Sequence, residues 1–80
     1  MRIDKYLKLS RIIKRRTVAK EACEQERVTL NGKIAKPGAE VETGDVIHIE
    51  FGTGSLTLKV LQTPNVVRKE DADTLYEVLS

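Results

Sequence analysis

The stretch that determines the fold is RVTLNGKIA, residues 27–35. Its first half alternates apolar and polar side chains, which is the pattern of a half-buried strand. The pair Asn31-Gly32 is the dipeptide preferred where both central residues of a tight turn need positive φ. The stretch therefore predicts a hairpin that joins a strand at 27–30 to a short strand at 33–35, and with it the start of a sheet.

Upstream of this hairpin the apolar residues recur at helical spacing. They predict two short amphipathic helices, at 3–9 and 17–25. Thr17 is the expected N-cap of the second helix, because its side-chain oxygen can accept from the free amides of the first turn. The connection at 10–16 is polar apart from two isoleucines, which we expect to anchor it to the core.

Downstream, alternating residues predict strands at 46–51 and 56–61. Residues 36–39 indicate a type II turn and residues 43–45 another turn. The tail at 70–79 opens like a helix but can equally end as an edge strand. The elements predict an α+β fold: two N-terminal helices, a mainly antiparallel sheet of four to five strands, and a short C-terminal helix or edge strand.

Size and composition exclude several classes of protein. Eighty residues, with no linker or repeat, indicate one domain at 1–80. One cysteine cannot form an internal disulfide, and with one histidine it cannot complete a zinc site. No apolar run approaches the roughly 20 residues of a membrane span. We therefore expect a cytoplasmic protein with no membrane association.

The residues that catalysis would need have simpler explanations. His48 falls on the polar side of a strand, as solvated histidines do, and Cys23 shares the apolar stripe of the second helix. Gly52-Thr53-Gly54 lacks the third glycine of a dinucleotide loop. The pair Asp71 and Asp73 is more simply a solvated surface. The sequence therefore predicts a protein that is not an enzyme and that binds neither a metal nor a cofactor.

Charge is divided unevenly along the chain. The overall net charge is +2, yet residues 1–36 carry a net charge of +7 and residues 37–80 a net charge of −5. A cationic half attracts a polyanion over about a Debye length, and an acidic half limits indiscriminate adhesion. This division is the first indication of function.

The cations of the first 20 residues form the candidate binding set, with one acidic residue, Asp4, among them. Lysine and arginine suit phosphate oxygens, and arginine can also stack on exposed bases. Glu21, Glu24 and Glu26 would repel phosphates if the second helix entered a DNA groove along its length. Folded RNA is therefore the expected partner, and a merely solubilising surface is the alternative. The set is Arg2, Lys5, Lys8, Arg11, Lys14, Arg15, Arg16 and Lys20.

Several motifs occur in the order found in a known module. MRIDKYL at 1–7, SRIIKRRTVA at 10–19, VTLNG at 28–32 and GDVI at 44–47 resemble the RNA-binding domain named after the fourth small-subunit ribosomal protein. The resemblance covers residues 1–51. It implies two helices packed on a small twisted sheet, with RNA along the basic helical surface and the adjacent hairpin. It adds Asn31 and Lys33 to the expected RNA contacts.

Among stand-alone members, the chain is most similar to those of ribosome-associated quality control, a group related to the heat-shock ribosome-binding proteins. That resemblance implies a monomer that binds obstructed large ribosomal subunits and contacts both rRNA and the P-site tRNA. It would hold the tRNA while an RqcH-type factor adds C-terminal alanines. Two alternatives remain open, a heat-shock-type recycling factor and a basic protein-interaction module.

Two positions carry specific structural expectations. Asp4 can serve as an ordinary helix-start carboxylate, which we favour, or can orient a neighbouring arginine. Members of the family usually have glycine, in a left-handed conformation, where this chain has Glu26. Either the turn after the second helix is rebuilt or the protein tolerates the strain.

Overall fold

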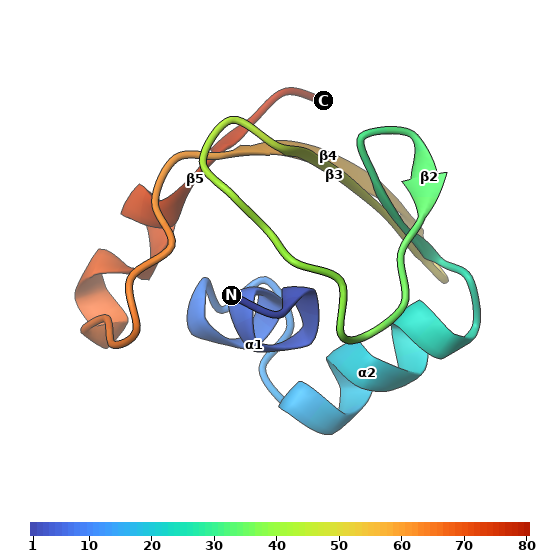
Figure 1. Ribbon diagram of the computed structural model, residues 1–80, viewed down its shortest axis with the longest axis horizontal. Coiled ribbons are helices and arrows are strands. Elements are labelled where there is room, and N and C mark those ends of the chain that lie inside the picture. The colour runs from blue at the N-terminus through green and yellow to red at the C-terminus, as the bar shows by residue number, and fades with distance from the viewer.

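The computed structural model describes residues 1–80, which form one sheet with all helices on the same side (Figure 1). The helices are α1 (Ile3–Leu9), α2 (Arg16–Glu24) and the 3₁₀ helix η1 (Lys69–Leu75). The strands are β1 (Val28–Leu30), β2 (Lys33–Ile34), β3 (Val46–Phe51), β4 (Gly54–Val60) and β5 (Tyr76–Val78). The spatial order is β2-β1-β3-β4-β5, and every neighbouring pair is antiparallel. The predicted α+β class is confirmed.

The core lies between the helices and the inner face of the sheet. Alternation places Ile47, Ile49 and Leu58 fully out of solvent on that face, opposite Ile3 and Leu7 of α1. Tyr6 is buried with them, and its hydroxyl donates to the carbonyl oxygen of Leu75 at 2.7 Å. Burial raises the pKa of that phenol. The C-terminal segment is thereby tied to the first helix.

The predicted Asn31-Gly32 turn is confirmed. Both residues have positive φ, at 52° and 84°. For the tail, the sequence was compatible with either a helix or an edge strand. The structure contains both, because η1 is followed directly by β5 at the edge of the sheet.

Two local predictions are wrong. The second helix begins at Arg16, with Arg15 at the N-cap position and no side-chain cap, so Thr17 lies inside the helix. The turn at 36–39 is closed by the amide of Ala39 donating to Lys36, but Gly38 lacks the positive φ that a type II turn requires. Its carbonyls instead accept from the start of α1, so tertiary hydrogen bonds determine its shape.

Of the two alternatives for the turn after the second helix, the structure shows the strained one. Glu26 has φ of 62°. The amides of Glu26 and Arg27 donate to Cys23 and Ala22, which is the double hydrogen-bond pattern of a Schellman motif. Glycine normally occupies the left-handed position of this motif, and a side chain there costs about 1 kcal/mol.

Glu26→Gly is therefore expected to stabilise the protein. Relief of the left-handed strain should raise Tm by about 4–8 °C for a domain of this size, measured by circular dichroism. Gln25→Gly is the matched control, because Gln25 has φ of −85° and gains nothing from glycine there. An unchanged or lower Tm for Glu26→Gly would show that the turn is not strained.

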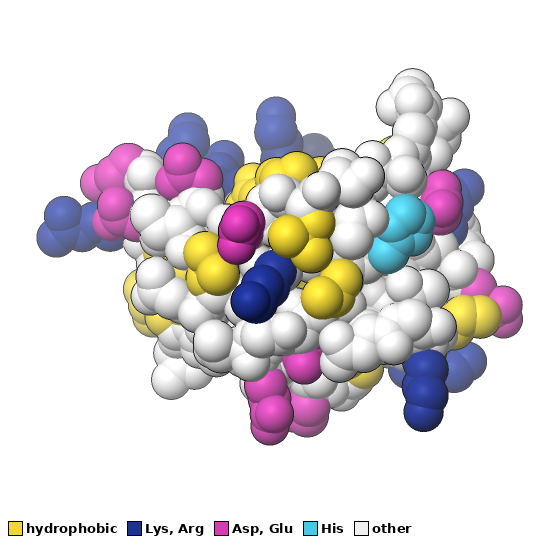
Figure 2. All heavy atoms as spheres, turned by 90° about the horizontal axis from the view of Figure 1, so that it is seen from above, with side chains coloured by type: hydrophobic (Ala, Val, Ile, Leu, Met, Phe, Trp, Pro, Cys, Tyr) yellow, Lys and Arg dark blue, Asp and Glu magenta, His cyan; other side chains and the backbone are white.

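The outer face of the sheet is not covered by any helix. Figure 2 looks onto it and shows hydrophobic, basic and acidic side chains interspersed with the single histidine. Charge of one sign does not accumulate there. None of the helices has the length and apolar character needed to cross a membrane.

Candidate nucleic-acid interface

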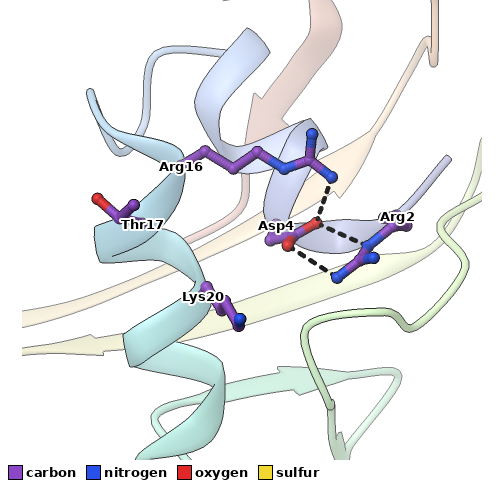
Figure 3. Close-up of a pocket in the computed structure, with 5 residues that line it drawn as sticks. All are labelled: Arg2, Asp4, Arg16, Thr17 and Lys20. Atoms are coloured by element: carbon purple, nitrogen blue, oxygen red, sulfur yellow. Dashed lines mark hydrogen bonds and ion pairs between the residues drawn. The ribbon is translucent and has the colours of Figure 1, made fainter.

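A hollow of about 280 Å³ lies where the N-terminal segment meets the start of α2. Figure 3 shows its lining side chains, none of which is hydrophobic. They are Arg2, Asp4, Arg16, Thr17 and Lys20. Two elements that are distant in the chain thus contribute cations to one concave surface.

One buried carboxylate holds two arginines in this hollow. Asp4 is 2 % exposed. Arg2 donates to it from Nε at 3.2 Å and from Nη2 at 3.1 Å, and Arg16 donates from Nη2 at 3.4 Å. The dashed lines of Figure 3 mark these contacts. Our preferred explanation of Asp4 as a plain helix-start carboxylate was therefore incomplete, since it orients both guanidinium groups.

The packing of the two helices explains this convergence. Ala19 and Cys23 are buried in the same core cluster as Ile3 and Leu7, so α2 lies against α1. Arg16 and Lys20 follow each other by one helical turn, which places them on the same side.

The hollow remains positively charged despite its internal carboxylate. Asp4 neutralises one of the two arginines, and Lys20 has no ion-pair partner. The side chains of Arg2 and Arg16 are 50 % and 48 % exposed. Each guanidinium has five N–H donors and uses at most two on Asp4, so most donors still face solvent. The site can bind an anionic group such as a phosphate.

The other predicted cations do not enter the hollow. Lys5 is half-buried in α1, and the remaining four are exposed along the end of α1 and the connection to α2. They are Lys8, Arg11, Lys14 and Arg15, none of which has a salt-bridge partner. The predicted cations thus fall into two groups. Arg2, Arg16 and Lys20 line the hollow, and the others lie on α1 and on the connection between the two helices.

Asn31 and Lys33 differ in what their side chains can do. The amide nitrogen of Asn31 donates to Asp45 at 3.1 Å, and its amide oxygen accepts from the backbone of Val46 at 2.9 Å. Asn31 therefore fastens the hairpin to the start of β3. Lys33 is exposed on β2 and has no partner within the protein.

The sequence analysis did not predict that Thr17 lines the hollow, because it assigned Thr17 to a helix cap. It also did not predict that Asp4 contacts two arginines. A signal for Asp4 was present, because it is the only acid among the first 20 residues and lies two positions after Arg2. The residues considered for catalysis lie elsewhere. His48 hydrogen-bonds Thr57 and Glu50 in the sheet, each at 2.7 Å.

Cys23 is buried, and burial raises the pKa of its thiol to about 11, with contributions from Asp4 and Glu24. A thiol that remains protonated is a poor nucleophile. Nowhere in the structure do three or more His, Cys, Asp or Glu side chains lie close enough together to hold a metal ion.

The fold and this hollow together define a class of protein: a small α+β domain with converging arginines on its surface. Comparison with known proteins makes the class specific. The S4 domain family matches residues 1–47. The RQC P-site tRNA stabilizing factor of Halalkalibacterium halodurans is 55 % identical over 98 % of this chain and 89 % of its own length. The factor of the same name from Streptococcus pneumoniae is 49 % identical over 100 % of this chain and 91 % of its own length.

A solved structure agrees with the sequence comparisons. Heat Shock Protein 15 of Vibrio cholerae, described as trimeric, superposes with a TM-score of 0.92 at 31 % identity, covering 100 % of this chain and 82 % of that one. The chain belongs to the S4 domain family, and within it to the RQC P-site tRNA stabilizing factors, the RqcP group. The resemblance stated from the motifs is thus confirmed. The relatives' names also support the prediction that the protein is not an enzyme.

Proposed function

We propose that this protein is an RNA-binding factor of ribosome-associated quality control that stabilises the P-site tRNA on obstructed large ribosomal subunits. The observation that carries the proposal is the pair Arg2 and Arg16, held 3.1–3.4 Å from one buried carboxylate with most of their donors free. Such a preformed fork suits phosphate oxygens. The names of the relatives support a P-site tRNA as the RNA that carries those phosphates.

The protein acts as a clamp and makes no covalent bond. The hollow with Arg2, Arg16 and Lys20 takes one RNA backbone, and the exposed run from Lys8 to Arg15 provides a second cationic surface. In this proposal the two surfaces bridge rRNA and P-site tRNA. Lys5 and Lys33 extend the contacts, and Asn31 holds the hairpin that carries Lys33.

The finer elements of the proposal concern partners. Residues 1–80 act as one cytoplasmic, monomeric unit that holds the tRNA while an RqcH-type factor adds C-terminal alanines to the stalled chain. The trimeric Heat Shock Protein 15 makes the oligomeric state a useful measurement. Light scattering is expected to give the mass of a monomer, 9.0 kDa.

A second candidate function is supported by the same structural neighbour. A TM-score of 0.92 to Heat Shock Protein 15 favours a heat-shock-type factor as the alternative. In this alternative the protein would recycle the large subunit. Deletion distinguishes the two functions, because loss of alanine tails on stalled products follows only from the tailing role. The third possibility is a basic protein-interaction module. In that case the protein would still capture its partners after treatment with nuclease.

The proposed function predicts binding that depends on both salt and tRNA. Large subunits carrying peptidyl-tRNA should co-sediment with the protein, and log affinity should fall with log salt with a slope steeper than about −3, one unit for each phosphate contact. Vacant large subunits are the control and should bind more weakly. Equal binding to both kinds of subunit would contradict stabilisation of the tRNA.

A further inference from the structure

A second hollow, of about 510 Å³, lies beside the β1–β2 hairpin. Unlike the first hollow it has a largely apolar lining, and its charged members are both lysines. The lining residues are Leu30, Lys33, Ile34, Ala35, Lys36, Gly38 and Ala39. The hollow thus combines an apolar floor with cations and contains no acidic side chain.

Ile34 and the two lysines of this hollow are available to a ligand. Ile34 is 54 % exposed. Lys33 and Lys36 are exposed and form no salt bridge. The protein itself therefore leaves these groups without partners.

The turn at 36–39 lines the second hollow and lies against Arg2 and Asp4, which line the first. The amide of Ile3 donates to Ala39 at 2.8 Å, and that of Asp4 donates to Pro37 at 3.4 Å. A side chain at Gly38 would lie 3.9 Å from the guanidinium carbon of Arg2. A backbone bound by Arg2 and Arg16 thus needs only to cross one tight turn to reach Lys36.

We propose that the second hollow binds one unstacked nucleotide of the RNA held by the first hollow. The base lies on the apolar floor formed by Ile34 and its neighbours, and Lys33 and Lys36 contact the flanking phosphates. This inference rests on the proposed RNA-binding function and adds which kind of RNA the protein prefers to bind. Its ligand is an unpaired nucleotide at a bulge, loop or end.

The chemistry of RNA supports this ligand over a paired one. Bases within an A-form helix are stacked and cannot reach an apolar pocket, whereas unpaired bases can be splayed out. A base has apolar faces and is always joined to phosphates, so an apolar floor beside two lysines matches both parts. The volume also lies in the range of small-ligand sites, about 300–1,000 Å³.

The test compares two RNA hairpins that differ by one nucleotide. One carries a single 2-aminopurine bulge, and the other is fully paired. The full chain is expected to bind the bulged hairpin about fivefold more tightly, which corresponds to the roughly 1 kcal/mol gained when about 40 Å² of apolar surface is buried. Insertion should also change the fluorescence of the 2-aminopurine.

Matched variants locate the effect. Ile34→Ala should abolish the preference for the bulge, whereas Val78→Ala should retain it. Val78 is 56 % exposed at the opposite edge of the sheet, so the two variants lose similar surface. Lys36→Ala should lower the salt slope for the bulged hairpin by about one unit, and Lys59→Ala, on β4, should not.

The outcomes separate this inference from the proposed function. Failure of the full chain to bind either hairpin would contradict RNA binding itself. Equal binding of both hairpins, or a preference that Ile34→Ala leaves intact, would overturn the nucleotide site alone. An acidic peptide that binds the full chain but not Ile34→Ala, while the RNA preference persists, would assign the hollow to a protein partner and overturn the proposal.

Discussion

Arg16→Ala is expected to weaken association with peptidyl-tRNA-bearing large subunits about tenfold while leaving Tm almost unchanged. The binding loss follows because a charge-assisted hydrogen bond to phosphate contributes about 1.5–3 kcal/mol. The melting temperature changes little because Arg16 is half-exposed and its 3.4 Å contact with Asp4 is a weak, screened ion pair. Arg2 still holds the buried carboxylate through two bonds.

Co-sedimentation across a salt series and thermal denaturation measure the two effects separately. The salt slope should fall by about one unit for Arg16→Ala and not for the control Lys59→Ala. Arg2→Ala should weaken binding similarly but lower Tm more, since Arg2 makes the bidentate contact. A fall in Tm as large as the fall in affinity would show that Arg16 is a structural residue.

Asp4→Asn provides the sharpest test of how the hollow is built. The substitution keeps the shape of the side chain but removes the charge that both guanidinium groups share. Because Asp4 is buried, loss of its charge-assisted hydrogen bonds should lower stability by about 2 kcal/mol. Urea denaturation measures this change.

The expected effect of Asp4→Asn on RNA affinity distinguishes two explanations of the carboxylate. If Asp4 only reduced the positive charge, its neutralisation would tighten binding. If Asp4 holds Arg2 and Arg16 in position, binding should weaken about tenfold despite the extra net charge, because each free arginine must then be ordered on binding. We expect weaker binding. Tighter binding at every salt concentration would refute the positioning role.

A double-mutant cycle connects these two predictions. The effects of Asp4→Asn and Arg16→Ala on affinity should not add, because both remove the same oriented donor. Additive effects would mean that Arg16 finds its RNA-binding position without Asp4.

Most of the local features of this protein, apart from the cap of α2 and the turn at 36–39, could be predicted from the sequence alone. Helical spacing before residue 26, alternation after it, and Asn31-Gly32 between two strands predicted the α+β fold and the main turn, because each signal is contained within a few neighbouring residues. The family resemblance marked Glu26 as a position of strain or of a rebuilt turn, and only the structure decided for the strained conformation. The division of charge identified the cationic half in the same way.

Only the tertiary structure decided which of those cations act together. Asp4 and Arg16 are 12 residues apart and meet because α1 and α2 bury a common core. The turn at 36–39 reaches Ile3 and Asp4 through backbone hydrogen bonds, which set its shape against its own turn preference and place it beside the N-terminal residues of α1. Contacts between residues so distant in the chain depend on the packing of whole elements, and no local pattern encodes that packing.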